Sequence, residues 1–290
     1  MADTSGMKDL RGLDIQKLAV GFAEEANVLK KYCRVSSTGA REIRWYSKTA
    51  GFLDSTDTTG ITASQIANTS DKSRPVVVEQ SWTRNTSYVR KYFVESPMIS
   101  DEDIRDTDID ILATNVRDLV RAVERQVDSR IYTVLSTGTG VLTAAATADG
   151  WDDAATGNPI LDLLEAKRQI RTNGYNPEGA VLYINPIEHK NLLNWLINVK
   201  GSSIPSFATQ KVESGVVMEL LGCQVVVSEN ATTDQALLFT REAGCWKEFT
   251  PLTTGIVEEV GIGKKIRVWE EGEALLTDPK ASFLITGTVV

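Results

Sequence analysis

Residues Asp106–Gly138 read DTDIDILATNVRDLVRAVERQVDSRIYTVLSTG, and this stretch predicts one long helix. Apolar side chains recur every three or four positions, which is the repeat of a single apolar face on an α-helix. Asp106 and Thr107 are candidate N-caps, and the acidic side chains beside them suit the positive end of the helix dipole. A helix of about 28 residues forms a rod of about 40 Å. The expected packing stripe does not keep the strict heptad of a coiled coil and contains Leu112, Val116, Leu119, Val123, Val127 and Ile131.

The residues before the long helix predict an extended β-hairpin. REIRWYSK (41–48) and SRPVVVEQSWTRNTSYVRKYFVES (73–96) alternate polar and apolar side chains as strands do. The stretch between them is rich in Thr, Ser, Asp and Gly, and a segment so poor in apolar residues cannot fold alone. Because an isolated hairpin is only marginally stable in water, we expect this one to lie on another surface.

The first part of the chain allows two interpretations. Residues 8–32 have a loosely helical apolar spacing, with a mixed polar face. They form either an arm that packs on something else or an ordinary first helix.

After the long helix, helices and strands alternate. NPILDLLEAKRQIRTNG (158–174) predicts a helix with Asn158 as N-cap, Pro159 at the first position and Gly174 just beyond its end. A buried strand, EGAVLYIN, and a second helix, PIEHKNLLNWLINV, follow. Together with the strands of MELLGCQVVVSEN and QALLFT they predict a compact α/β domain over residues 158–245. The tail returns to strands in GIVEEVGIGKKIRVWEEGEALL and KASFLITGTVV.

Composition excludes several classes of function. The net charge is −8, so the basic footprint of a nucleic-acid-binding protein is absent. The single histidine, His189, excludes two-histidine metal sites, and its place in the first turn of a helix favours a surface residue over a catalytic one. Cys33, Cys223 and Cys245 are odd in number and far apart, which fits a reducing compartment without a disulfide or a zinc site. No apolar run approaches the roughly 20 residues of a membrane span.

No motif indicates catalysis. Asp106, Asp108 and Asp110 have the spacing of a calcium loop, but an EF-hand starting there would need Gly and Glu where Ile111 and Arg117 stand. No nucleophile lies beside a candidate base. We therefore expect no catalytic residue, no metal and no cofactor, and favour a structural protein. A hydrolase that uses carboxylates is the alternative from another class.

The order of these elements resembles the major capsid proteins of tailed double-stranded DNA viruses, which share the Hong Kong 97 phage fold. The resemblance covers nearly the whole chain, and its specificity lies in the order and spacing of four segments. These are KYFVESPMISDEDIRDTDIDILATNVRDLVRAVERQVDSRIY, LLEAKRQIRTNGYNPEGAVLYINPIEHKNLL, LLGCQVVVSEN and EGEALLTDPKASFLITG.

The resemblance implies an α+β capsid fold with five regions and no enzymatic activity. These regions are an N-terminal arm (1–40), an extended β-hairpin loop (41–92), a peripheral domain with a spine helix (93–157), an α/β axial domain (158–245) and returning peripheral strands (246–290). The hairpin would lie across an adjacent subunit, and Trp45 and Trp82 would either anchor it there or pack on each other. The candidate contacts between subunits are Arg44, Trp45, Lys48, Lys72, Trp82 and Arg84.

The same resemblance implies the partners. Copies of the chain would form the pentamers and hexamers of an icosahedral shell, which encloses double-stranded DNA without reading its sequence and without a membrane. The protein would be found in the virion, and in the host cytoplasm during assembly. A portal and decoration proteins are possible partners. We expect any scaffolding protein to be a separate chain, because the arm and hairpin account for the residues before the spine helix. An encapsulin-like nanocompartment shell, which has the same fold, is the alternative.

Overall fold

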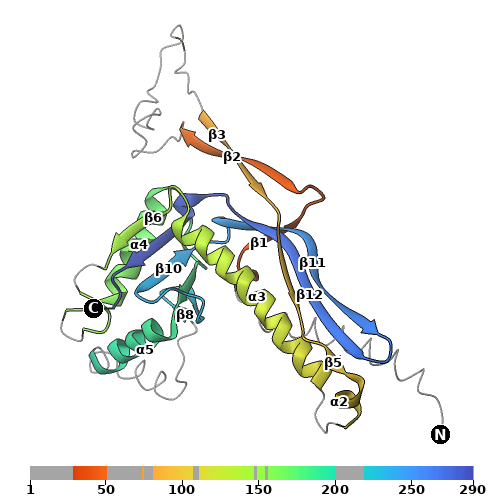
Figure 1. Ribbon diagram of the computed structural model, residues 1–290. Coiled ribbons are helices and arrows are strands. Elements are labelled where there is room, and N and C mark those ends of the chain that lie inside the picture. Colours follow the sequence, from red (N-terminus) through yellow and green to blue (C-terminus); the bar gives the residue numbers. More distant parts are fainter. Residues whose placement is uncertain are drawn as a thin grey trace. The chain divides into compact units, whose positions relative to one another are not determined.

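The computed structural model describes residues 29–50, 74, 81–106, 111–146, 149–153, 156–199 and 219–289 (Figure 1). The chain divides into two compact units. Unit 1 contains Met1–Arg41, Tyr88–Val134 and Cys245–Leu275, and unit 2 contains Glu42–Ser87, Leu135–Gly244 and Leu276–Val290. None of the helices among the described residues is long and apolar enough to cross a membrane.

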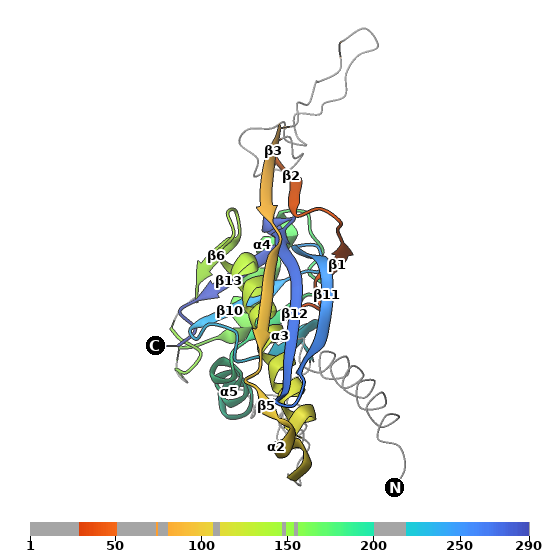
Figure 2. The ribbon, with the colours of Figure 1, turned by 45° about the vertical axis from the view of Figure 1, so that its right-hand side comes forward.

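Unit 1 is built on a sheet whose strands come from distant parts of the chain. The sheet order is β1-β11-β12-β4, and β5 also pairs with β12. β1 runs parallel to β11, and β12 runs antiparallel to both β4 and β5. β11 and β12 lie side by side along the long helix α3 (Figure 2). The bounds are β1 Arg34–Ser37, β4 Arg90–Glu95, β5 Ile99–Ser100, β11 Gly244–Glu259 and β12 Gly263–Leu276.

The long helix α3, Ile111–Thr137, packs its apolar face on this sheet. Val116, Val120 and Val123 form one buried cluster with Ile266 and Val268 of β12. The β-branched side chains of β12 suit a pleated surface, and the helix covers them.

The start of the long helix differs from the sequence prediction. Asp106 ends a short helix, α2 (Asp101–Asp106), instead of capping the long one. The cap of α2 is Ser100, whose hydroxyl accepts a hydrogen bond from the Asp103 N–H at 3.0 Å. Thr107 and the three residues after it lie outside the described residues. A helix starts at Ser100 because serine is a favourable N-cap and the acidic side chains that follow it stabilise the first turn of a helix.

Unit 2 contains a six-stranded sheet in the order β6-β13-β10-β7-β9-β8, with the helices α4 and α5. β7 lies near the middle, antiparallel to β10 and parallel to β9, and all four of its side chains are buried. A strand buried on both faces reads as a continuous apolar run, as VLYI does. The bounds are β6 Leu142–Ala145, β7 Val181–Ile184, β8 Glu219–Leu220, β9 Cys223–Val227, β10 Gln235–Phe239, β13 Ser282–Thr286, α4 Pro159–Thr172, α5 Pro186–Asn194 and a π-helical turn, η2, Trp195–Val199.

Asparagine caps set the start of both unit 2 helices. The Asn158 side chain accepts a hydrogen bond from Leu161 N at the start of α4, and Asn185 accepts one from Ile187 N at the start of α5. Gly174 follows α4 with a φ of 86°, a backbone conformation that favours glycine. The cap signals of the sequence therefore position α4.

The last strand is not part of the peripheral sheet to which the sequence assigned it. β13 lies between β6 and β10 in the unit 2 sheet. Residues 135–157 and 276–290 thus belong with the α/β domain. The first four residues of β13, whose sequence is SFLIT, are all buried. Such a strand is suited to an interior position in a sheet that is covered on both faces.

The hairpin consists of β2 (Glu42–Ala50) and β3 (Ser81–Tyr88), which form a two-stranded sheet of their own. The second flank predicted from the sequence is divided. Its last part is β4, which pairs with β12 in unit 1. The polar tip lies outside the described residues.

Candidate assembly surfaces

The inner face of the hairpin is used within the subunit. Ile43 is buried and Trp45 is half-buried, whereas Arg44 and Tyr46 are exposed, so the expected alternation of β2 is present. The Trp45 indole N–H donates a hydrogen bond to the Leu276 carbonyl oxygen at 3.1 Å. Because the indole N–H of Trp45 already has an acceptor within the subunit, this group is not available for a hydrogen bond to a neighbouring copy.

The outer face of the hairpin is open. Trp82 on β3 is 55% exposed, and Tyr46 on β2 is 63% exposed. Arg84 is exposed, and the Arg44 Nε donates to Glu42 Oε1 at 2.6 Å. Exposed aromatic rings beside arginines have the composition of interface cores. The sequence analysis did not select Tyr46 as a contact residue. Its position next to Trp45 in the alternation of β2 could have indicated that its ring faces outward.

The remaining hairpin candidates are the pairing of Trp45 with Trp82 and the two lysines. The ring contacts Tyr92–Trp246 and Phe93–Trp269 lie in unit 1, and no contact between the Trp45 and Trp82 rings is seen among the described residues. The side chains of Lys48 and Lys72 lie outside the described residues.

The proposed packing stripe of α3 faces the core for most of its length. Leu112, Val116, Val123, Val127 and Ile131 are buried. Leu119 is only partly buried, and the fully buried side chain in that turn is Val120. The sequence analysis did not predict that two acidic residues of α3, Glu124 and Asp128, are buried as well.

The turn between β11 and β12 exposes apolar side chains. Val260 is 95% exposed and Ile262 is 59% exposed. Glutamates precede this tip and lysines follow it, and Lys265 Nζ lies 3.5 Å from Glu259 Oε1. An apolar tip between opposite charges is suited to contact with another subunit.

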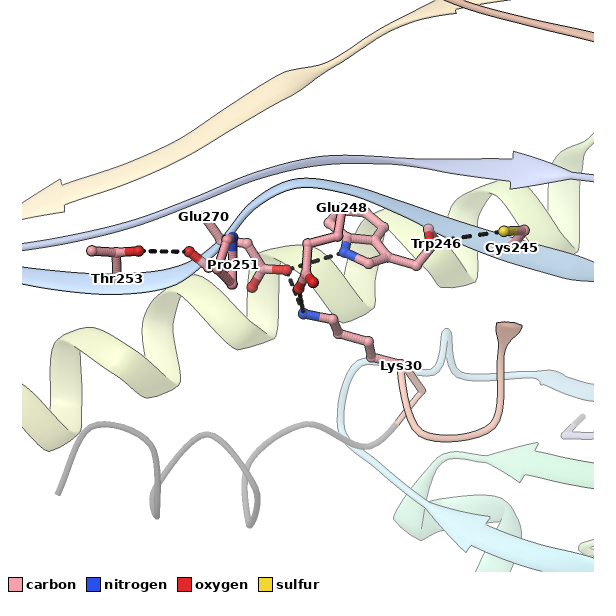
Figure 3. Close-up of polar contacts among 7 residues, drawn as sticks. All are labelled: Lys30, Cys245, Trp246, Glu248, Pro251, Thr253 and Glu270. Atoms are coloured by element: carbon pink, nitrogen blue, oxygen red, sulfur yellow. Dashed lines mark hydrogen bonds and ion pairs between the residues drawn. The ribbon is translucent and has the colours of Figure 1, made fainter. Parts of the chain in front are cut away.

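Unit 1 also buries a cluster of charged groups, shown in Figure 3. Lys30 Nζ lies 2.6 Å from Glu270 Oε1 and 3.0 Å from Glu248 Oε1. The Trp246 indole N–H donates to the same Glu270 oxygen at 3.1 Å. Glu124, on α3, is 1% exposed. Burial, with the nearby Glu270 charge, raises the pKa of Glu124 to about 8, although Lys30 partly offsets the effect.

A second buried carboxylate, that of Glu273, lies on β12, the strand that also carries Glu270. Glu273 is fully buried, and its carboxylate pairs with the Arg130 guanidinium of α3. Arg90 Nε of β4 lies 3.1 Å from its other oxygen, Oε2, without the alignment of a hydrogen bond. β12 therefore carries buried acids that meet cations from three segments of unit 1.

The raised pKa of Glu124 predicts a pH-dependent effect on stability. The folded chain keeps this proton up to about pH 8, whereas the unfolded chain loses it near pH 4.5. The free energy of unfolding therefore falls as pH rises between these values. We expect Glu124→Gln to remove this loss and to be more stable than the wild type at pH 8 by about 2–4 kcal/mol. Urea unfolding of the unassembled subunit at several pH values measures it.

Glu165→Gln is the control for this prediction. Hydrogen bonds from Arg168 and Gln169 lower the pKa of Glu165 to about 2. The stability that it contributes is present above its unfolded pKa and is lost as pH falls, so its replacement is expected to lower stability slightly at neutral pH. If the free energy of unfolding of Glu124→Gln depended on pH in the same way as that of the wild type, Glu124 would not be a buried acid that stays protonated in the folded subunit.

The side chains that could ligate a metal are scattered in the described part of the chain. Among them, no three His, Cys, Asp or Glu side chains are placed to hold a metal ion. His189 is half-buried in the first turn of α5, and burial lowers its pKa.

Comparisons with known proteins identify the class. A family described as phage capsid protein matches residues 98–281. The capsid structure of Cyanophage P-SCSP1u is similar, with a TM-score of 0.65 at 13% identity over 90% of this chain and 88% of that one. A virus-like particle from Pyrococcus furiosus gives 0.63 at 12% identity, over 94% and 97%. The capsid of Myoviridae phage XM1 gives 0.60 at 13% identity, over 90% and 92%. No curated protein matches the sequence.

The likeness to these structures establishes the fold, which is the shell-building fold expected from the order of the segments. The chain belongs to the phage capsid protein family, whose match spans more than half of its length. It is a major capsid protein that forms the head shell of a tailed phage, and its place is the virion after assembly in the host cell. The nanocompartment alternative is not favoured.

Proposed function

We propose that identical copies of this subunit join as pentamers and hexamers through the outer face of the β2–β3 hairpin, and that the subunit acts without catalysis. The observation that carries this proposal is the exposure of Trp82, a large apolar ring with 55% of its surface open. Burial of such a ring against a neighbour contributes about 1.5–3 kcal/mol, and each subunit would gain it. The exposed Val260 tip supports further contacts with other copies.

Trp82→Ala tests the hairpin contact. Because more than half of the Trp82 surface is open in the single subunit, the free subunit is expected to keep most of its stability. Shells should form less efficiently or fall apart at about 1–2 M lower denaturant, since a buried aromatic anchor is lost at every copy. Electron microscopy and light scattering measure the two effects.

Thr86→Ala is the matched control, because Thr86 is an exposed, non-aromatic residue of the same strand. It is expected to assemble as the wild type does. Normal assembly and unchanged shell stability in Trp82→Ala would remove Trp82 from the interface.

The proposed shell is held without covalent bonds between subunits. Some relatives join a loop lysine to an asparagine of a neighbour's peripheral domain. The returning strands, residues 246–290, are the segment expected to supply it, and they contain no asparagine; the last one in the chain is Asn230. The glutamates of this segment carry carboxylates, which have no amide nitrogen to leave as ammonia when a lysine amine attacks. Mature particles boiled in detergent should therefore run as one band near 31.8 kDa. A ladder of multimers under reducing conditions would disprove this.

A further inference from the structure

The charged side chains of α3 are divided between the inside and the outside of the molecule. The acids Glu124 and Asp128 are buried. The arginines of this helix are all exposed or half-buried, and they are Arg117, Arg121, Arg125 and Arg130. Between Leu112 and Thr137, Asp118 is the one exposed acid. The open face of α3 is therefore basic, although the whole chain has a net charge of −8.

Three of these arginines, Arg117, Arg121 and Arg125, form a row that we name the α3 ridge. They stand four residues apart, and side chains with this spacing lie one above the other on a helix, about 6 Å apart along its axis. Two exposed hydroxyl residues, Ser129 and Thr133, continue the same row. Like charges four residues apart destabilise an isolated helix. An anionic partner would offset this repulsion.

The ridge is accessible to such a partner. Arg121 and Arg125 are exposed, and the Arg117 side chain is 40% exposed, with its Nε 3.5 Å from Asp118 Oδ1. A guanidinium carries five N–H donors in a planar fork, so a contact at one nitrogen leaves other donors for a phosphate oxygen. The helix α2, whose first turn is acidic, lies at the N-terminal end of α3 (Figure 1) and limits the basic surface on that side.

The composition of this face fits a phosphate backbone better than the surface of another copy. Ala122 and Gln126 stand beside the ridge, and none of the exposed large apolar side chains in the described part of the chain belongs to α3. The cores of protein interfaces are rich in aromatic and apolar groups and poor in charges. The hairpin face, with Trp82 and Tyr46, has that composition, and the α3 ridge has the opposite one.

The spacing of the ridge also suits duplex DNA. Contact with a nucleic-acid backbone requires only cations and hydrogen-bond donors, because its partners are phosphate oxygens. Two base pairs advance about 7 Å along the axis of a duplex, and successive ridge arginines are about 6 Å apart. The long, flexible arginine side chains span the difference.

We propose that the α3 ridge is a contact surface for the duplex DNA packaged in the head, in which Arg117, Arg121 and Arg125 bind phosphates of the DNA backbone. The contact reads no sequence, because every base pair carries the same phosphates. Three cations on an otherwise acidic subunit bind DNA weakly. Weak contacts repeated at every copy hold the duplex against the shell and let it slide while the head fills. The proposal concerns the content of the head and does not depend on the hairpin contact between copies.

Salt-dependent binding of DNA to the full-length, unassembled subunit tests the ridge. The probe is a fluorescent duplex of mixed sequence, and fluorescence anisotropy measures its association constant at several salt concentrations. Three phosphate contacts predict a slope of about −2.7 for the logarithm of this constant against the logarithm of the salt concentration, or a loss of about fortyfold between about 50 and 200 mM. Arg121→Gln should remove one contact and reduce the slope to about −1.8.

Two further variants separate the ridge from the general charge of the subunit. Arg241→Gln is the matched control, because Arg241 is an exposed arginine outside α3. It removes the same charge and should leave the slope unchanged. Ser129→Arg adds a fourth cation to the row and should steepen the slope to about −3.6. Tighter binding by this variant would not arise from a damaged fold.

DNA-filled heads supply a second measurement. Ultraviolet irradiation joins protein to DNA where the two are in contact, and mass spectrometry identifies the linked peptides. We expect peptides of α3 among them.

Several results would overturn the proposal. These are a wild-type subunit that does not bind the duplex at about 50 mM salt, equal slopes for the wild type and Arg121→Gln, and cross-links in filled heads that leave out α3. If Arg121→Gln kept its DNA affinity but no longer formed shells, the ridge would be a contact between copies, and the assignment to DNA would be wrong. Failure of the hairpin contact is measured separately with Trp82→Ala.

Discussion

Val123→Asp is expected to yield insoluble subunits or subunits that cannot assemble. Val123 is 3% exposed and packs in the cluster that α3 forms with Ile266 and Val268 of β12. A carboxylate placed there has no cation or hydrogen-bond donor prepared for it, and the loss of stability is about 3–5 kcal/mol. Because a domain is stable by only about 5–15 kcal/mol, a loss of this size removes much of the folded population. Solubility, circular dichroism and electron microscopy of particles measure it.

Ala122→Asp is the control for this substitution. Ala122 is the preceding residue of the same helix and is exposed, so the new carboxylate reaches water. Its subunits should fold and assemble. Soluble, assembled Val123→Asp shells would show that this face of α3 is not the packed one.

Gly272→Ala is expected to destabilise unit 1 strongly. A Cβ at Gly272 would lie 2.4 Å from Cζ2 of Trp246 and 2.8 Å from the Lys247 carbonyl oxygen. The Trp246 ring cannot move aside freely, because it is fully buried and donates to Glu270. We expect a loss of about 2–4 kcal/mol, measured by urea unfolding of the free subunit.

Gly39→Ala is the control, since a Cβ there meets nothing within 4 Å. It should leave the stability unchanged or raise it slightly. If Gly272→Ala were as stable as Gly39→Ala, the close packing of Trp246 on β12 would be wrong.

The sequence predicts those parts of the fold whose signals are local. The apolar repeat of α3, the asparagine caps of α4 and α5 and the continuous apolar run of β7 each depend on neighbouring residues. Their order along the chain predicts the capsid fold, and the family match and similar structures confirm it. The sheet to which β13 belongs has no local signal, because β6 and β10 reach it from far along the chain.

The buried acids of unit 1 could not be predicted for a related reason. The stretch WEEGEALL, residues 269–276, reads as a polar segment, yet Glu270 and Glu273 are fully buried. Their cationic partners lie hundreds of positions away, at Lys30, or on other elements, at Arg90 and Arg130. Only tertiary structure brings these charges together.

The order of the unit 1 sheet has a consequence for synthesis of the subunit. β1 and β4 come from the first hundred residues, but the two strands between them, β11 and β12, begin at Gly244 and Gly263. While the ribosome makes the middle of the chain, the apolar face of α3 has no sheet to cover it. The unit 2 sheet also lacks the strand between β6 and β10 until β13, which follows β12 in the chain, emerges. A polypeptide released early therefore leaves both cores unfinished and exposed to chaperones and proteases. This dependence on β11, β12 and β13 favours the entry into the growing head of copies in which these strands have already been made.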